Sequence, residues 1–339
     1  MRIWSLQRPD PRRKSGRGAD GPGLVGGASR PRCSVGRDDR SRESWTQGEP
    51  RVDSRRSTRL VAAAFAASLV VAACGGDDDG AVPQSGERET TTTEATTTTV
   101  AAPAEGEPLQ ILVTNDDGVG AEGIDALVTA LTALEGVEVT VVAPAGEQSG
   151  TGGNATEGPL TSTPSQTAGG YEATAVEGFP ADTIRVAFED QGLTPDLVVS
   201  GINAGQNLGP LVDVSGTVGA ARAAVRLGVP ALAVSQGMGD APDYATAAEL
   251  VVAWVEENRA AIAAGELATD TVVNLNVPTC ATGEVRGTLE VESATAGDAL
   301  AASDCTATTD GFTDDVTAFT NGFATMTVVP VEPAAQAAA

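Results

Sequence analysis

The chain has 339 residues, a formal charge of −25 and no histidine, and 15 of its 21 basic residues lie in positions 1–59. No lysine follows Arg59. Without histidine, this part of the chain cannot carry Ser-His-Asp or Cys-His catalysis or an HExxH zinc site, and without lysine it cannot form a P-loop or a Schiff base. Its acidic charge argues against binding to nucleic-acid polymers.

The first 58 residues are rich in Arg, Gly, Ser, Pro and Asp and show no apolar periodicity. A segment of this composition cannot bury enough apolar surface to fold. Residues 1–58 are therefore predicted either to be disordered or to be absent from the natural protein because the start codon is assigned too early.

Residues 59–74 have the features of a lipoprotein-type signal peptide. A basic flank precedes an apolar run from Leu60 to Ala73, which ends at Cys74. The run is shorter than the roughly 20 residues that span a bilayer, and this pattern is typical of secretory signals. Its last four residues, VAAC, resemble a bacterial lipobox, which implies an exported protein with a lipid on Cys74 and an anchor in the outer face of the cytoplasmic membrane. An uncleaved anchor or a buried helix is the alternative.

Residues 75–108 are dominated by Thr, Gly, Asp and Glu and carry almost no large apolar side chains. They are predicted to be a low-complexity linker that tethers the following domain.

Two cysteines, Cys280 and Cys305, remain once Cys33 is removed with the leader and Cys74 is lipidated. Outside the cytosol a pair of thiols suggests one disulfide, which would close a loop of about 25 residues and contribute roughly 3 kcal/mol. The alternative is two unpaired small residues.

From residue 109 to residue 333 the sequence is typical of an α/β domain. Strands are expected at 109–114, 137–143, 171–176, 196–200, 231–235 and 271–277, and helices near 121–135, 181–190, 216–227 and 243–263. Apolar runs such as DLVVS and ALAVS, without polar alternation, indicate strands covered on both faces. The sequence therefore predicts a mostly parallel, doubly wound sheet with helices on both faces, in which ligands bind beyond the carboxyl ends of the strands.

Asp116 and Asp117 follow the first of these strands, where both carboxylates can project into that crevice. Two close carboxylates repel unless a cation or a proton neutralises one of them, and a hard divalent ion such as Mg²⁺ or Mn²⁺ meets this need. Ser149 and Asn203, in two other loops at the same edge, are candidate neutral oxygen ligands. The alternative is that NDDG is a surface turn, Ser149 a plain loop serine and Asn203 a turn residue.

Ser215, Gly216 and Thr217 precede an Ala-rich helix, so their hydroxyl and N–H groups could bind an anion with help from the helix dipole. The alternative is an ordinary helix N-cap. A metal ion beside a phosphate-sized anion site suggests phosphomonoester hydrolysis.

Six blocks of the sequence, in this order, resemble the SurE family of 5′/3′-nucleotidases. They are TNDDGVGAEGI (114–124), VVAPAGEQSG (141–150), EGFPADTIRVAF (177–188), DLVVSGINAGQNLG (196–209), VSGTVGAARAAVRLGVPALAVS (214–235) and VVNLNVP (272–278). The resemblance implies a Rossmann-like fold and a divalent-metal phosphatase that acts on nucleoside monophosphates. It implies that Asp116, Asp117, Ser149 and Asn203 bind the metal, and that Asn115 and the turn 215–217 bind phosphate.

A mechanism follows as a hypothesis: a metal-activated water attacks phosphorus, and Asp116 or Asp117 takes its proton. The second loop is less basic than the family usually has. The short segment 279–313 implies a reduced dimerisation arm, so a homodimer stays open. The rival function is a surface-anchored lipoprotein that binds a metal or nucleotide without turnover, while a dinucleotide-cofactor enzyme is disfavoured because no GxGxxG follows the first strand.

Overall fold

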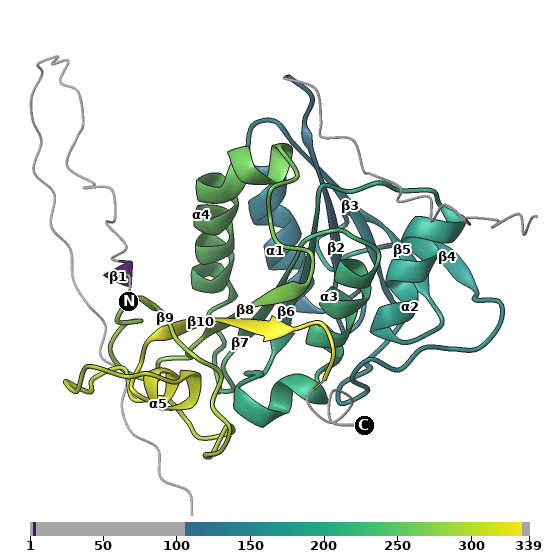
Figure 1. Ribbon diagram of the computed structural model, residues 1–339. Coiled ribbons are helices and arrows are strands. Elements are labelled where there is room, and N and C mark those ends of the chain that lie inside the picture. Colours follow the sequence, from purple (N-terminus) through teal and green to yellow (C-terminus); the bar gives the residue numbers. More distant parts are fainter. Residues whose placement is uncertain (1–2, 5–105, 334–339) are drawn as a thin grey trace, which may run out of the picture. The chain divides into compact units, whose positions relative to one another are not determined.

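The computed structural model of the protein describes residues 3–4 and 106–333, which form one mixed sheet with helices on both of its faces (Figure 1). The strands are β1 (Ile3–Trp4), β2 (Leu109–Thr114), β3 (Val137–Pro144), β4 (Ser162–Gln166), β5 (Glu172–Val176), β6 (Leu197–Ala204), β7 (Ala231–Gln236), β8 (Thr271–Val277), β9 (Thr288–Glu290) and β10 (Ala324–Pro330). The α-helices are α1 (Glu122–Thr132), α2 (Pro180–Arg185), α3 (Gly216–Arg226), α4 (Tyr244–Ala263) and α5 (Asp315–Thr320).

The sheet order is β1-β9-β10-β8-β7-β6-β2-β3-β5-β4. The central strands β8, β7, β6, β2, β3 and β5 run parallel, so their carboxyl ends meet at one edge. The order reverses at β2, because β3 lies on one side of it and β6 on the other. Crevices at such a reversal are where doubly wound folds bind ligands. The predicted fold class is confirmed.

Alternate residues of the central strands enter two separate cores. Ile111 and Val113 pack with α1 and α4 on one face, where Trp254 of α4 lies in the core. Leu112, between them, packs with α2 and α3 on the other face. Because both faces are covered, the strands consist of continuous apolar runs, as the sequence indicates.

Several elements differ from the prediction. The strand β4 was not expected: its residues STPSQ are mostly exposed and contain proline, and it pairs at the sheet edge with β5. The expected helix 181–190 is divided into α2 and a π-helical turn, Val186–Asp190. The elements β9, α5 and β10 were also unpredicted, because β9 and α5 are too short for a periodic signal and β10 pairs antiparallel with β8.

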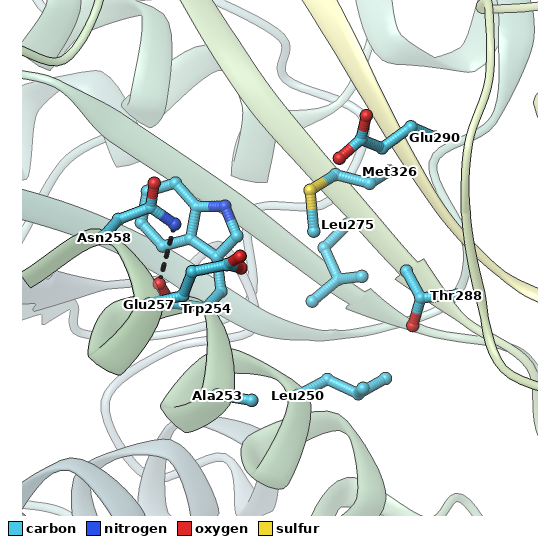
Figure 2. A pocket seen from close by; sticks show the side chains of 9 residues that line it. All are labelled: Leu250, Ala253, Trp254, Glu257, Asn258, Leu275, Thr288, Glu290 and Met326. Atoms are coloured by element: carbon cyan, nitrogen blue, oxygen red, sulfur yellow. Dashed lines mark hydrogen bonds between the residues drawn. The ribbon is translucent and has the colours of Figure 1, made fainter. Parts of the chain in front are cut away.

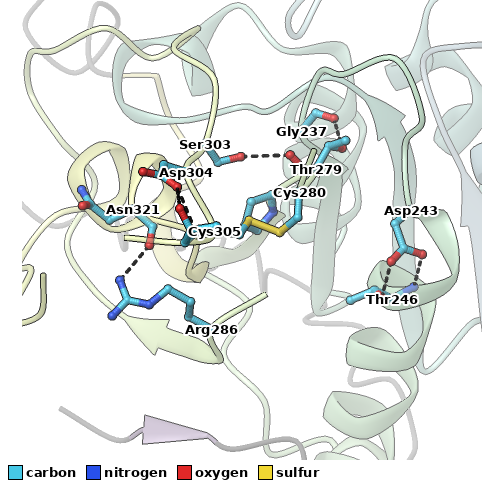
Figure 3. Close-up of a disulfide and its surroundings, with 12 residues drawn as sticks. Gly237, Asp243, Thr246, Thr279, Cys280, Arg286, Ser303, Asp304, Cys305 and Asn321 are labelled. Atoms are coloured by element: carbon cyan, nitrogen blue, oxygen red, sulfur yellow. Dashed lines mark hydrogen bonds between the residues drawn. A yellow bond between two sulfur atoms is a disulfide. The ribbon is translucent and has the colours of Figure 1, made fainter. Parts of the chain in front are cut away.

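The predicted disulfide between Cys280 and Cys305 is present, with Cα atoms 5.6 Å apart (Figure 3). It ties the segment after β8 to the loop before α5. Thr279, beside Cys280, accepts a hydrogen bond from Ser303 through its carbonyl oxygen.

In the part of the chain that the structure describes, no helix is both long and apolar enough to cross a lipid bilayer. The predicted leader, signal peptide and linker (1–58, 59–74 and 75–108) lie outside the described residues, apart from residues 3–4 and 106–108.

Candidate functional site

Three loops and the carboxyl end of β6 meet at one edge of the sheet, where the sequence predicts four loops. The amide of Gln148, after β3, donates to the carbonyl of Asp116, after β2, at 2.7 Å. The amide of Gly152 donates to the carbonyl of Val214, just before α3, at 3.0 Å. The last residue of β6, Ala204, reaches Asp117 through its backbone N–H. Residues far apart in the sequence are thereby brought to one edge of the sheet.

Asp116 is held by the first turn of α3. Its side chain is only 3% exposed, and its Oδ1 accepts a 2.6 Å hydrogen bond from the hydroxyl of Thr217. A Cβ on Gly216 would lie 2.9 Å from Asp116 Oδ2. Glycine at position 216 therefore lets the helix backbone approach this carboxylate without covering its second oxygen.

Asp117 lies beside the carboxyl end of β6, which also contains Asn203, so Asn203 is a strand residue and not the loop residue that the sequence suggests. The Oδ2 of Asp117 accepts a 2.9 Å hydrogen bond from the backbone N–H of Ala204. The neighbouring Asn203 is buried and donates through Nδ2 to the carbonyl of Gly205, which leaves its amide oxygen as the group that can bind a cation.

Both carboxylates are electrostatically strained. Burial, and then the charge of Glu147, raise the pKa of Asp116 above its usual value of 3.8, while the hydrogen bond from Thr217 opposes this. Burial and the charge of Asp116 raise the pKa of Asp117 to about 6. Such shifts are typical of carboxylates that a bound cation would stabilise.

Ser149 is placed less firmly than the other candidate ligands. It is exposed, and its backbone N–H donates to Glu147 Oε1 at 2.7 Å. Within the described residues its hydroxyl makes no hydrogen bond to Asp116, Asp117 or Asn203. The loop does bring Ser149 to the site, because the preceding residue is bonded to the Asp116 carbonyl.

Ser215 is the N-cap of α3, since its hydroxyl accepts from the amide of Val218 at 3.1 Å. The simpler alternative for this residue is thus present in the structure, and the hydroxyl of Thr217 is committed to Asp116. Phosphate binding by the turn 215–217 stays a prediction, and it rests on Gly216 and the N-terminus of α3.

Asn115 is fully buried. Its Nδ2 donates to the carbonyl of Gly118 at 2.9 Å, while its Oδ1 has no hydrogen-bond partner among the described residues. A buried acceptor without a partner is costly, and a ligand donor or a cation would satisfy it.

Sequence reasoning missed a buried amide network behind Thr217. Asn207 donates to Ser235 at 2.9 Å and to Thr217 at 3.4 Å, and its own backbone is held by Asn276. The motif NLN on β8 was recognised only as part of a family block. Its role depends on contacts between strands, which no local pattern encodes.

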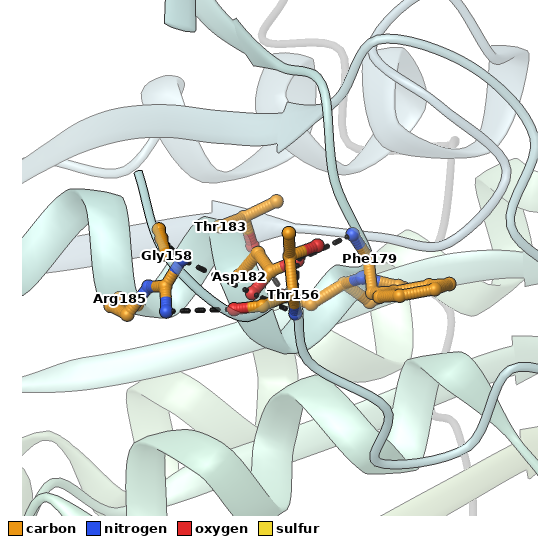
Figure 4. Close-up of polar contacts among 7 residues, drawn as sticks. Thr156, Gly158, Phe179, Asp182, Thr183 and Arg185 are labelled. Atoms are coloured by element: carbon orange, nitrogen blue, oxygen red, sulfur yellow. Dashed lines mark hydrogen bonds and ion pairs between the residues drawn. The ribbon is translucent and has the colours of Figure 1, made fainter. Parts of the chain in front are cut away.

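Asp182 at the start of α2 was also missed. Its buried carboxylate accepts from the backbone and hydroxyl of Thr156 and from the amide of Phe179 (Figure 4). Arg185 adds hydrogen bonds to the carbonyls of Thr156 and Gly158. These contacts fix the far end of the loop that carries Ser149.

A separate cavity of about 150 Å³ lies between α4 and the strands β8, β9 and β10 (Figure 2). Trp254, Leu275 and Met326 line it together with Glu257 and Glu290. None of the candidate site residues borders it, so it belongs to a different part of the molecule.

The donors at the sheet edge fit a hard divalent cation. Two carboxylates, the Asn203 amide oxygen and the Ser149 hydroxyl are all oxygen ligands, which Mg²⁺ and Mn²⁺ prefer. In the described part of the chain no group of three or more Cys, Asp or Glu side chains could hold a metal ion. A metal at this edge would therefore need neutral ligands as well as the aspartate pair.

Comparison with known proteins agrees with this arrangement. The family model of the survival protein SurE matches residues 111–298. The chain is 42% identical over 185 residues to the 5′-nucleotidase SurE of Brevibacillus brevis, covering 53% of this chain and 70% of that protein. It is 41% identical over 182 residues to the 5′-nucleotidase SurE of Thermosipho melanesiensis, covering 53% and 69%.

The same relationship appears among solved structures. The SurE protein of Aquifex aeolicus superposes with a TM-score of 0.54 at 28% identity, covering 66% of this chain and 94% of that protein. The matched segment contains every candidate site residue, from Asn115 to Thr217. The chain therefore belongs to the SurE family.

Proposed function

We propose that the protein is a divalent-metal phosphomonoesterase that hydrolyses nucleoside 5′-monophosphates, and 3′-monophosphates as a further substrate class, to nucleoside and phosphate. The observation that carries the proposal is the contact between Asp116 and Thr217, which joins the aspartate pair to the N-terminus of α3. The names of the related proteins support the substrate class.

Asp116, Asp117, Ser149 and Asn203 would hold Mg²⁺ or Mn²⁺, which when bound supplies a Lewis acid that lowers the pKa of water and offsets phosphate charge. Thr217 keeps Asp116 fixed through its hydroxyl. Ala204 donates to Oδ2 of Asp117 and thereby orients this carboxylate, and Asp116 or Asp117 takes the proton of the attacking water. The water oxygen forms a bond to phosphorus, the ester P–O bond breaks, and the released nucleoside oxygen takes a proton from solvent.

The phosphate is oriented by the first turn of α3. This helix has 11 residues, and its unpaired N–H groups and dipole favour an anion at the N-terminus. Asn115 directly follows β2, and its Nδ2, the group that can donate to a phosphate oxygen, donates to the carbonyl of Gly118, so phosphate binding by Asn115 requires this bond to be exchanged. Arg222, in the same helix, forms an ion pair with Asp213 at 2.8 Å. The phosphate charge is therefore offset by the helix N-terminus and not by this arginine.

The test is phosphate release from a panel of nucleoside monophosphates by the full chain, with Mg²⁺ or Mn²⁺, with a chelator, and with Asp116→Asn. Metal-dependent release that the variant loses is expected. Saturable thermal stabilisation by the nucleotide without any phosphate release would instead support the binding lipoprotein.

We also propose that the mature protein is exported and anchored through a lipid on Cys74. The basic flank, apolar run and VAAC sequence support this, and a disulfide at Cys280–Cys305 is consistent with an oxidising compartment. Mass spectrometry should find the lipid on an N-terminal Cys74, and Cys74→Ser should release the protein from membranes. An unmodified Cys74 in membrane-bound protein would refute the anchor.

A further inference from the structure

Met238, in the loop between β7 and α4, exposes an apolar side chain next to the candidate site. It is 49% exposed, and its Cγ lies 3.5 Å from the position that a Cβ on Gly205 would occupy. The Nδ2 of Asn203 lies 3.9 Å from the same position. The side chains of Met238 and Asn203 therefore both lie next to Gly205.

Gln206 links Met238 to a second exposed apolar side chain. Its buried amide accepts from the backbone N–H of Met238 at 2.9 Å. Through Nε2 the same amide donates to the carbonyls of Ala299 and Ala301, at 3.3 and 3.4 Å. Leu300, between those two residues, is 58% exposed. One side chain thus fixes the two backbone segments that carry Met238 and Leu300.

The segment with Leu300 is also tied to the body of the domain. The disulfide between Cys280 and Cys305 and the hydrogen bond from Ser303 to Thr279 hold it beside the end of β8 (Figure 3). Gly237, which precedes Met238, donates its amide to Val277 at the same strand end at 2.7 Å. Both apolar side chains are therefore presented by anchored backbone.

We propose that Met238 and Leu300 form an apolar wall that binds the base of a nucleoside monophosphate whose phosphate lies at the aspartate pair. This rests on the proposed function and names the part of the substrate recognised beside Asn203. A nucleoside monophosphate carries a flat aromatic ring across the sugar from its phosphate. The thioether of Met makes favourable contacts with aromatic rings and adapts to their shape, so the wall accepts purines and pyrimidines with little discrimination.

The variant Met238→Ser/Leu300→Ser tests the wall, with Leu227→Ser as the matched control. Leu227 is also an exposed apolar residue, but it lies at the opposite end of α3 from Ser215. Hydrolysis of AMP is compared with hydrolysis of ribose 5-phosphate, which has the same phosphate and sugar but no base. The ratio of kcat/KM for AMP to that for ribose 5-phosphate is expected to fall about tenfold in the double variant, or about 1.4 kcal/mol. It should stay constant in Leu227→Ser.

Binding is measured independently of turnover by saturation-transfer NMR with adenosine. The base protons should receive saturation from the wild-type protein and lose most of it in the double variant. If no substrate is hydrolysed but this pattern holds, the proposed function fails and the wall stands. Unchanged saturation and an unchanged kcat/KM ratio in the double variant would overturn the wall, and an accompanying change in sedimentation would assign these residues to a subunit contact.

Discussion

The hydroxyl of Thr217 donates a 2.6 Å hydrogen bond to Oδ1 of Asp116, across 101 positions of the sequence. Asn207 donates in turn to the Thr217 hydroxyl from behind. The position of the buried carboxylate is therefore set by the N-terminus of a helix on the other side of the crevice.

Thr217→Val removes this hydrogen bond at constant side-chain volume. Partners that orient a metal ligand in this way typically contribute 10- to 100-fold in affinity or activity, so we expect a loss of about that size in Mn²⁺ affinity. Thr217→Ser should retain most of the affinity. The measurement is calorimetric titration with Mn²⁺, and the control is Thr132→Val, which removes from an exposed threonine of α1 a hydroxyl that donates to the carbonyl of Val128. Equal affinity in Thr217→Val and wild type would show that Thr217 does not position Asp116.

Asp117 should make the metal-free protein less stable at neutral pH. Its pKa is about 6 in the folded protein and 3.8 as the reference value, so the folded state holds the proton more tightly than the unfolded state. Its contribution to the free energy of unfolding therefore rises as the pH falls from above 6 toward 4, and is lost as the pH rises through 6. Asp117→Asn should raise the urea midpoint at pH 7.5 in chelator and flatten its pH dependence.

A divalent cation should also raise the urea midpoint of the wild-type protein at pH 7.5, because it neutralises the charges of Asp116 and Asp117 without a proton. The control is Asp270→Asn, which removes an exposed carboxylate directly before β8 and should change neither the urea midpoint nor its pH dependence. If Asp117→Asn lowered the metal-free midpoint, the carboxylate would be stabilising and its raised pKa wrong.

Gly219→Ala should displace the loop that carries Ser149. A Cβ at Gly219 would lie 2.0 Å from the carbonyl oxygen of Gly152, so either α3 or the loop must move. We expect the free energy of unfolding to fall by about 1–3 kcal/mol, the usual cost of overpacking, and Mn²⁺ to bind more weakly. Gly153→Ala, where a Cβ meets open space, is the control for urea unfolding and Mn²⁺ titration. Similar behaviour of the two variants would contradict this close approach.

Asp182→Ala should loosen the other end of that loop. It leaves the amides of Thr156 and Phe179 without their acceptor, at about 1–3 kcal/mol for each group that stays buried. Hydrogen exchange should increase at residues 153–158 while exchange in α4 stays unchanged. Uniformly faster exchange would mean a general loss of stability instead.

The disulfide should stabilise the protein by about 3 kcal/mol, because it closes a loop over 25 positions. The variant Cys280→Ser/Cys305→Ser should lower the free energy of unfolding by about this amount. A reductant should reproduce the loss in the wild type and have no effect on the variant. A reductant effect in the variant would point to another cause.

The sequence by itself determined the central parallel sheet and the edge of the sheet at which the candidate residues lie. Short apolar runs such as DLVVS and ALAVS favour strands that are covered on both faces, and NDDG follows the carboxyl end of β2, whereas SGIN lies within β6. The two cysteines likewise indicated their disulfide, because few partners remained.

The tertiary structure decided which groups contact Asp116 and Asp117 or act on their charge. The bond from Thr217 to Asp116, the charge of Glu147 and the anchoring of loop 145–156 by Asp182 join residues from separate elements, and none leaves a local pattern. The strands β4, β9 and β10 were decided in the same way, because short or half-exposed strands form when a neighbouring strand supplies hydrogen bonds. Local apolar patterns are read from nearby residues, whereas burial and charge at the site depend on contacts made only once the chain has folded.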